Sequence, residues 1–377
     1  MARLGDLFLH VRNGANIKQG LDNTGYPITR IETISNRTVN RNKMGYAGIT
    51  DVSKYSDYIL QDGDILMSHI NSEIHLGKTA LYEKKDNEII IHGMNLLSLR
   101  PNKDLIDSKY AFYYLSSQAF LRQIPNITKK SVNQASFTVS ALKELDFSVT
   151  TIEEQKKVAN DLDKLNNLIE LRTQQLSKFD KLVKSRFIEL FGDPIMNPRG
   201  WQTMALEDNA TLLNGRAYKQ DELLDSGKYP VLRVGNFFSN REWYYSNLEL
   251  NEDKYCDNGD LLYAWSASFG PQIWNGGKVI YHYHIWKVLV GKAYNKQFLC
   301  NLLEYTTESL MNDTHGIAMM HLTKSGMEKN EFIVPPLELQ EQFAAFVEQT
   351  DKSKLAIQQS LEKLETLKKA LMQQYFG

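Results

Sequence analysis

Residues 335–377 read PPLELQEQFAAFVEQTDKSKLAIQQSLEKLETLKKALMQQYFG, and residues 150–192 read TTIEEQKKVANDLDKLNNLIELRTQQLSKFDKLVKSRFIELFG. The two stretches align at a constant offset of 185 without an insertion. The matched positions include Gln340 with Gln155, Leu361 with Leu176, Lys369 with Lys184, and Phe376-Gly377 with Phe191-Gly192. A fixed register over this length indicates a rigid element, because loops accumulate insertions.

Both copies have the apolar spacing of one long helix. The spacing alternates between four and three residues, which is the seam of a coiled coil. The expected seam comprises Leu162, Leu165, Ile169, Leu176, Phe179, Val347, Ile357, Leu361, Leu364 and Leu371. About 38 residues at ~1.5 Å each predict a rod of roughly 57 Å. An ordinary core helix is the alternative, but core helices seldom reach this length or recur in register.

The repeat continues into the segments that precede each helix. Asn13-Gly14 matches Asn214-Gly215, Tyr26-Pro27 matches Tyr229-Pro230, and Asp62-Gly63-Asp64 matches Asn258-Gly259-Asp260. The offset changes from 201 to 203 and then to 196 along these motifs, so two related globular parts differ in their loops. The chain is therefore predicted to contain a globular domain (1–150), a helix (151–192), a second globular domain (193–335) and a second helix (336–377).

The fold class expected is α+β, with two mixed domains, two long antiparallel helices and a pseudo-twofold repeat. Strands are predicted at 28–34, 64–67, 88–91, 95–99 and 147–150, then at 229–234, 260–264, 279–283 and 285–290. Helices are predicted at 108–122 and 295–311, and the Asn-Gly and Asp-Gly pairs predict hairpin-type turns. Since the repeat requires the second helix to end where the first domain begins, Gly377 should lie near Leu4, and the facing seams should bury Leu162, Leu176, Phe179, Val347, Leu361 and Leu364.

Composition sets limits on the function. The 377 residues carry a net charge of −1 and 42% hydrophobic residues, values that suit a globular protein and not a general polyanion binder. No apolar run approaches the ~18 residues of a membrane span, and the N-terminus has no apolar signal core. A cytoplasmic location is therefore expected. Cys256 and Cys300 lie far apart and form no CxxC pair, which argues against a disulfide or a zinc site.

Several motifs suggest chemistry but lack a required part. Gly77-Lys78-Thr79 resembles the end of a phosphate loop, but Ser72 stands where that loop needs glycine. His282 and His284 could share a metal on one strand face, although no third ligand lies nearby in sequence. We find no adenine-methyltransferase motif, no glycine-rich cofactor fingerprint, no nuclease carboxylate set and no activated nucleophile. The chain is expected to be non-catalytic and to hold no metal or cofactor.

A polar and basic set in the loops remains. Lys and Arg contact phosphates, whereas Arg, Asn, Gln and Ser read base edges in the major groove. The DNA-binding candidates are Lys18, Arg30, Ser68, Lys129, Lys130 and Ser131 in the first domain, and Arg216, Lys219, Arg233, Ser266, His315 and Lys324 in the second. Arg30 with Arg233, and Lys18 with Lys219, recur at equivalent positions. Ordinary solvated surface charge is the alternative for each of them.

The order of these features resembles the specificity subunit of type I restriction–modification systems. The segments that carry the resemblance are Asp64-Ile-Leu-Met-Ser68 with Gly77-Lys78, Gly259-Asp-Leu-Leu262 with Gly270, Pro335-Pro-Leu337-Glu338 with Gln340, and the closing Leu371-Met-Gln-Gln-Tyr-Phe376. The first helix departs from the family pattern, because it begins after Thr150-Thr151 where the family often has Pro-Pro. The resemblance spans the whole chain, and each motif is weak alone.

The resemblance implies that this chain binds double-stranded DNA through two target-recognition domains and determines which DNA sequence the complex recognises. It also implies two methyltransferase (modification) subunits that use S-adenosylmethionine, and two motor–nuclease (restriction) subunits that use ATP and magnesium. Two readings from other classes stay open. One is a coiled-coil interaction scaffold without a DNA role, against which the repeated basic positions speak. The other is a self-contained modification enzyme, which would need the missing cofactor fingerprint.

Overall fold

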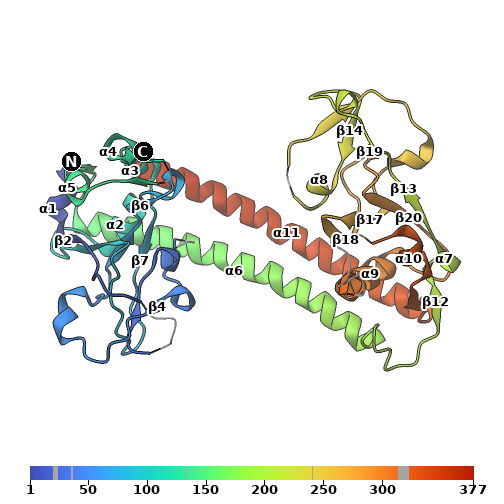
Figure 1. The fold of residues 1–377 in the computed structure, drawn as a ribbon, viewed down its shortest axis with the longest axis horizontal. Helices are drawn as coiled ribbons and strands as arrows, with labels where there is room; N and C mark the ends of the chain where they lie inside the picture. The colour runs from blue at the N-terminus through green and yellow to red at the C-terminus, as the bar shows by residue number, and fades with distance from the viewer. Residues whose placement is uncertain (20–23, 35–36, 133, 240, 313–321) are drawn as a thin grey trace. The chain divides into compact units, whose positions relative to one another are not determined.

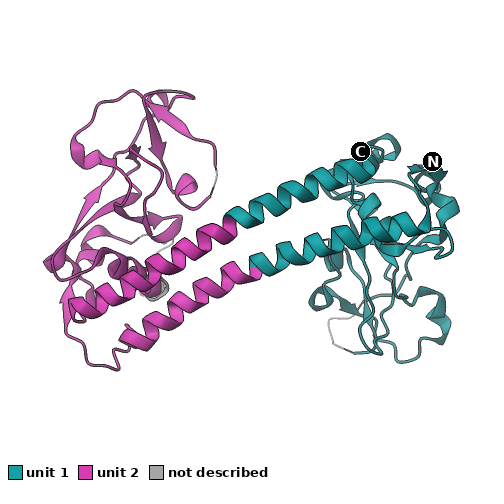
Figure 2. Ribbon diagram, turned by 180° about the vertical axis from the view of Figure 1, so that it is seen from behind, with its two compact units in different colours: residues 1–173, 359–377 teal, residues 174–358 magenta. Residues whose placement is uncertain are grey.

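A computed structural model of the chain describes residues 1–19, 24–34, 37–132, 134–239, 241–312 and 322–377. The chain forms two compact units, one of residues 1–173 with 359–377 and the other of residues 174–358 (Figure 2). Two 40-residue helices, α6 (Ile152–Phe191) and α11 (Leu337–Phe376), contribute one segment each to both units. No helix in the described ranges combines the length and apolarity needed to cross a bilayer.

The first unit mixes short strands with short helices (Figure 1). Its strands are β1 (Ala2–Arg3), β2 (Phe8–Asn13), β3 (Pro27–Ile28), β4 (Gly45–Tyr46), β5 (Ile65–Met67), β6 (Ile70–Asn71), β7 (Thr79–Leu81), β8 (Leu97–Pro101), β9 (Lys129–Lys130), β10 (Ala135–Ser136) and β11 (Asp146–Phe147). Its α-helices before α6 are α1 (Leu4–Leu7), α2 (Ser108–Leu115), α3 (Gln118–Leu121), α4 (Ile124–Ile127) and α5 (Val139–Lys143), and its 3-10 turns are η1 (Ile31–Ile34), η2 (Arg41–Lys43), η3 (Ser53–Tyr58) and η4 (Glu73–His75).

The second unit has a similar set of elements. Its strands are β12 (Thr203–Ala205), β13 (Ala210–Asn214), β14 (Tyr229–Leu232), β15 (Tyr244–Ser246), β16 (Tyr255–Cys256), β17 (Leu261–Ser266), β18 (Ser268–Ile273), β19 (Val279–Tyr281), β20 (Ile285–Val290) and β21 (Glu331–Ile333). Its α-helices before α11 are α7 (Leu206–Asn209), α8 (Val234–Phe238), α9 (Lys296–Asn312) and α10 (Lys324–Lys329), and its 3-10 turns are η5 (Gln220–Glu222) and η6 (Glu252–Lys254).

The two units share one sheet plan, which confirms the α+β repeat. The main sheet is antiparallel in both, with the order β2-β8-β5-β7 in the first and β13-β20-β17-β18 in the second. A two-stranded sheet joins the start of each unit to the strand before its long helix, as β1-β11 and as β12-β21. The repeat therefore extends from the helices to the topology of the globular parts.

The shared glycine motifs have specific structural causes. A Cβ atom on Gly14 would lie 2.3 Å from the backbone of Gly93, and one on Gly215 would lie 2.4 Å from the His282 carbonyl oxygen. The Asn-Gly pairs at these two positions mark close backbone approach and not hairpins, which corrects the sequence interpretation. Gly63 and Gly259 have φ of 90° and 86°, a region that favours glycine, and each forms the turn that precedes the central strand β5 or β17.

The aspartate after each of these turns closes it. The Asp64 carboxylate accepts the Gln61 N–H at 2.8 Å and pairs with Arg100 at 2.8 Å. In the second unit, Asp260 accepts the Asp257 N–H at 2.8 Å and pairs with Lys287 at 2.7 Å. Both basic partners lie on the neighbouring strand of the main sheet, so the motif fixes the turn to the sheet.

A buried glutamine fixes the start of each long helix. Gln155 is 0% exposed; its amide donates to the carbonyl oxygens of Leu105 and Thr150 and accepts the Asp107 N–H. Gln340 is also 0% exposed and makes the same three bonds with Ala293, Pro335 and Asn295. Asp107 and Asn295 immediately precede α2 and α9, so each glutamine joins its long helix to the loop that leads into the globular helix.

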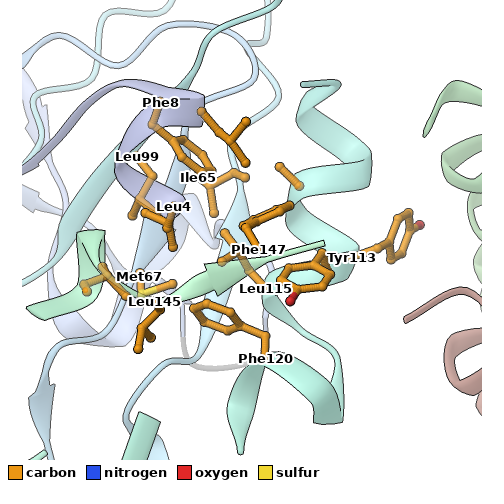
Figure 3. Packing of buried hydrophobic residues seen from close by; sticks show 14 of the residues in the cluster. Leu4, Phe8, Ile65, Met67, Leu99, Tyr113, Leu115, Phe120, Leu145 and Phe147 are labelled. Carbon is orange, nitrogen blue, oxygen red and sulfur yellow. The ribbon is translucent and has the colours of Figure 1, made fainter. Parts of the chain in front are cut away.

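The core of each unit receives the end of one long helix. In the first, the Phe376 ring lies 5.4 Å from Tyr110 and 5.8 Å from Tyr114, and it shares a buried cluster with Leu4. Figure 3 shows that cluster, in which Phe147 and Leu115 face the sheet residues. In the second unit Phe191 packs 4.7 Å from Phe298. Phe376 and Phe191 occupy equivalent positions in the repeat. The C-terminal end of α11 was expected near Leu4, and Phe376 shares the buried cluster with Leu4.

The two long helices are antiparallel where they pack. In the second unit Lys354 pairs with Asp180 at 2.8 Å, whereas Phe343 lies 5.7 Å from Phe191. Residues farther along α6 thus contact residues nearer the start of α11, as in an antiparallel pair. In the first unit the Tyr375 hydroxyl donates to Asp161 at 3.3 Å.

The expected seam is only partly buried. Leu162, Leu165 and Val347 are buried, and the other seam positions, Ile169, Leu176, Phe179, Ile357, Leu361, Leu364 and Leu371, are half-buried. Full burial of Leu176, Phe179, Leu361 and Leu364 was the wrong expectation. These residues lie in helix segments beyond the globular cores, where a two-helix seam has no third element to cover its flanks.

Some local predictions are wrong. The strand expected at 28–34 ends at Ile28 and is followed by the 3-10 turn η1. Residues 88–91 form no strand, and Ile91 makes only isolated bridges, to Ile28 and Ile59. The helix expected at 108–122 breaks at Ser116 and Ser117, where the Ser117 hydroxyl accepts the Phe120 N–H and starts α3. Short polar side chains that bond to the backbone here override the apolar periodicity.

Removing a glutamine amide should destabilise the unit that contains it. Gln155→Leu or Gln340→Leu would leave one buried N–H and two carbonyl groups without partners, at a cost of about 2–5 kcal/mol in the free energy of unfolding. The change is read as a shift of the urea midpoint followed by circular dichroism. The control Gln358→Leu, at an exposed position on α11, should change the free energy by less than about 0.5 kcal/mol. Equal midpoints for all variants would contradict the role assigned to the amides.

Candidate nucleic-acid interface

The first-unit candidates at 129–131 lie together on an exposed strand edge. Lys129 and Lys130 form β9, which pairs with β10, and the Ser131 hydroxyl donates to the Gln134 carbonyl at 2.9 Å. Lys130 forms an exposed ion pair with Glu73 at 2.8 Å. By the repeat offset, the corresponding part of the second unit falls at 314–321, so His315 lies outside the described residues.

Lysine candidates elsewhere are solvated. Lys18 and Lys219 are exposed, and Lys324 is half-buried on α10, 3.4 Å from Glu328. Exposure leaves Lys18 and Lys219 accessible to a phosphate group.

Two serine candidates do not reach the surface. Ser68 and Ser266 are only 2% and 5% exposed. The Ser68 hydroxyl accepts the Asn71 amide at 3.4 Å, and Ser266 pairs with Ser268 at the tip of the β17–β18 hairpin. In this structure both hydroxyls therefore lie below the surface, and a base contact from either one stays a prediction.

The arginines differ in whether their donors are already used. Arg216 makes two hydrogen bonds to Glu222, at 2.9 and 2.7 Å, and these bonds lower the pKa of Glu222 to about 2. Arg30 donates to the Gln19 side chain. Arg233 instead is exposed and has its guanidinium 5.1 Å from the centre of the Tyr244 ring. Arg30 and Arg233 are therefore equivalent in sequence but differ in their partners.

Arg233 lines a concave cleft of about 730 Å³ in the second unit, between α8, the following loop and the β17–β18 hairpin. Figure 1 labels α8, β17 and β18. The other side chains that line this Arg233 cleft include Asn236, Ser239, Arg241, Glu242, Tyr244, Ser268, His282 and His284. Nearly all of them are polar. Ala267 at the hairpin tip has φ of 66°, a left-handed conformation that is unfavourable for alanine by roughly 1–2 kcal/mol. The cleft thus combines hydrogen-bonding groups with a strained projecting turn.

Local structure positions the side chains of the Arg233 cleft. The Arg233 carbonyl accepts the N–H groups of Asn236 and Phe237 at 2.9 Å, so its residue starts α8. Gly235 leaves room for Arg241, since a Cβ atom there would lie 2.8 Å from the Arg241 Cδ. Burial, together with the charges of His284 and Arg233, lowers the pKa of His282 to about 4, so its ring is neutral at pH 7.

The sequence interpretation missed Asn236, Glu242 and Tyr244. A signal was present, because the repeat offset falls from 203 to 196 between Tyr229 and Asn258. Residues in that interval belong to the loop in which the two units diverge. Asn236, Glu242 and Tyr244 lie in this interval, so the change of offset identified their segment even though it could not identify the residues. Ser268 on the β17–β18 hairpin was also missed and lies outside the interval.

The described residues contain no group of three or more His, Cys, Asp or Glu side chains that could hold a metal ion. Cys256 and Cys300 are buried and free, and burial raises the pKa of the Cys300 thiol to about 12. What the interface offers is hydrogen bonding, charge and shape. These are the means by which proteins recognise nucleic acids.

A family model described as a type I restriction modification DNA specificity domain matches residues 1–179 and 198–368. The chain belongs to that family. A putative type I restriction enzyme MjaX specificity subunit from Methanocaldococcus jannaschii is 32% identical over 393 residues, covering 98% of this chain and 90% of the relative. The MjaVIII specificity subunit from the same organism is 22% identical, covering 84% and 79%.

A solved structure has the same fold. The match to the S subunit of the type I restriction–modification system of M. genitalium covers 100% of this chain and 95% of that subunit. The TM-score is 0.64 and the sequence identity is 14%. Specificity subunits are non-catalytic. The family therefore assigns this chain to DNA sequence recognition within a restriction–modification complex, in agreement with the resemblance in its sequence.

Neutral buried histidines make the stability of the chain depend on pH. Burial is the main cause that lowers the pKa of His10, His69 and His282 to about 4 and of His92 to about 3. The His92 Nε2–H donates to the Leu96 carbonyl at 2.9 Å, and its Nδ1 is buried without a partner, as suits a neutral ring. Because the unfolded rings titrate near 6.5, the unfolded state binds more protons below that pH.

Stability should therefore be complete above pH 6.5 and fall progressively as the pH is lowered towards 4. Thermal melting at pH 7.5, 6.5, 5.5 and 4.5 should show a decreasing midpoint over this window, and His92→Gln should make the decrease shallower. A melting temperature that is constant from pH 7.5 to 4.5 would contradict the burial of neutral histidines.

Proposed function

We propose that this chain reads a DNA site composed of two different half-sites, one for each unit. The observation that carries the proposal is a repeated scaffold with unlike loops. Gln155 and Gln340 make the same three bonds, and the main sheets have the same order, yet Arg30 and Arg233 have different partners. Two copies of one fold with different recognition groups suit a bipartite, asymmetric sequence.

The proposal includes partner subunits. Two modification subunits would dock on this chain and methylate adenine with S-adenosylmethionine, and two restriction subunits would join with ATP and magnesium. These cofactors are assigned to the partners. The half-exposed faces of the long helices and the repeated architecture support one equivalent docking surface for each modification subunit.

The coiled-coil scaffold without a DNA role is the alternative function. It predicts no shift of duplex DNA by the purified chain, whereas the proposed function predicts binding that weakens between 50 and 200 mM salt as phosphate contacts are screened. A shift assay at these two salt concentrations distinguishes the two readings.

Mapping of methylated adenines should reveal a split motif. The chain is expressed with its partner subunits in a host without other methyltransferases, and modified positions are sequenced. The expected result is two unlike half-sites separated by a spacer of unspecified bases. A single contiguous motif, or a palindrome, would refute the bipartite reading.

The helices are expected to set the spacer. Insertion of seven residues after Gln174 in α6 and after Gln359 in α11, which are repeat equivalents, preserves the 3.5-residue seam and adds roughly 10 Å to each helix. This length corresponds to about three base pairs. The spacer should lengthen while both half-sites stay unchanged. As a control, seven exposed residues at the same places are exchanged without a change of length, and methylation at the original spacing by the lengthened variant would show that the helices do not set it.

A further inference from the structure

The Arg233 cleft contains two opposite charges that do not neutralise each other. Arg233 and Glu242 both line it, and both are exposed. Within the described ranges, neither side chain forms an ion pair. By contrast, Arg41 and Arg216 are bound to Glu88 and Glu222. The cleft therefore keeps both a strong donor group and a strong acceptor group available.

Arg233 is held by its surroundings while its donors remain unused. Its backbone caps α8, and its guanidinium lies over the Tyr244 ring at 5.1 Å. A cation–π contact fixes the plane and position of a guanidinium without using its N–H groups. A donor pair held in this way loses little conformational entropy when it binds a planar acceptor edge.

Glu242 is presented on the same side as Tyr244. Glu242 and Tyr244 line the cleft, whereas Trp243 between them packs into the core 6.4 Å from Trp274. This alternation is that of an extended segment, in which residues two apart share a face. The Asn236 amide donates to the carbonyl oxygens of Arg241 at 2.9 Å and Glu242 at 3.1 Å, which holds the segment against α8. Asn236 is thus a positioning residue.

We infer that the Arg233 cleft reads a G·C base pair in the major groove, with Arg233 donating to guanine O6 and N7 and Glu242 accepting from the cytosine amino group. This inference rests on the proposed function and deepens it. Among base-pair edges, only G·C combines a double acceptor on one base with a donor on the other, for which arginine and a carboxylate are the matching side chains. An A·T pair would instead suit an amide side chain.

A phosphate group fits the cleft less well. Phosphate recognition uses cations and backbone N–H groups, and a carboxylate at the same place would repel the anion. Because Glu242 lines the same cleft as Arg233, a base edge is favoured, and Arg241, which also lines the cleft, can contact the backbone of the same DNA.

The test uses the full chain in complex with its modification subunits. Duplexes with randomised half-sites are methylated, and the modified molecules are sequenced for the wild type, Arg233→Ala, Glu242→Gln and the control Glu207→Gln, an exposed acid on α7. Arg233→Ala should lower the preference for guanine at one position roughly 10- to 100-fold. Glu242→Gln should weaken the preference for the same base pair. It should also allow adenine in place of the cytosine that Glu242 contacts, because an amide both donates and accepts hydrogen bonds.

The half-site of the first unit is the internal control and should not change in any variant. Circular dichroism melting curves that match the wild type confirm that the variants fold. The inference is overturned by a second-unit half-site without a G·C pair, by relaxation of different base pairs in the two variants, or by an equal loss of methylation on all sequences from Arg233→Ala, which marks a phosphate contact. Failure of the proposed function is seen separately, as the absence of a split motif in the wild type.

Discussion

The three hydrogen bonds of the buried glutamine amide are the constraint on which each unit depends. Gln155 and Gln340 bind the first turn of a 40-residue helix to the loop that starts α2 or α9, so a helix cannot rotate or slide without breaking three buried bonds. An unpaired buried amide costs free energy, which makes the arrangement intolerant of alternatives. The antiparallel seam, which is only half-buried over much of its length, does not need to fix the register by itself.

The consequence for recognition is a division of labour within each unit. Polar side chains that stabilise the scaffold pair with one another, as Asp64 does with Arg100 and Asp260 with Lys287. In the diverged segments some side chains also pair, as Lys228 does with Glu249, but others do not. Around α8 of the second unit, the Asn236 amide donates to backbone carbonyl oxygens, and the Arg233 and Glu242 side chains stay available for a ligand. The fold thus separates the interactions that set its shape from those that can choose a sequence.

Much of this fold could be predicted from the sequence, because the information was redundant. The helix bounds expected from the constant offset of 185 differ from those of α6 and α11 by one residue at each end. The 3.5-residue apolar spacing indicated that both segments are helical. Short strands were harder, since 28–34 and 88–91 have strand-like composition but few ladder partners, and backbone capping by Ser117 outweighed helical periodicity. The candidate site was the least predictable part. Residue type alone could not tell that Ser68 is buried or that Arg216 is bound to Glu222, because both facts depend on tertiary packing.

The comparison of Arg30 with Arg233 shows why recurrence in a repeat is a limited guide to specificity. Both arginines follow the same Tyr-Pro motif, and each stands immediately before a short helix, η1 or α8. In the first unit Gln19 binds the guanidinium, and in the second Tyr244, the first residue of β15, supports it with its ring face. A hydrogen bond uses a donor, whereas a ring face does not. Equivalent positions with different neighbours therefore present different groups to a ligand, as the proposed pair of unlike half-sites requires.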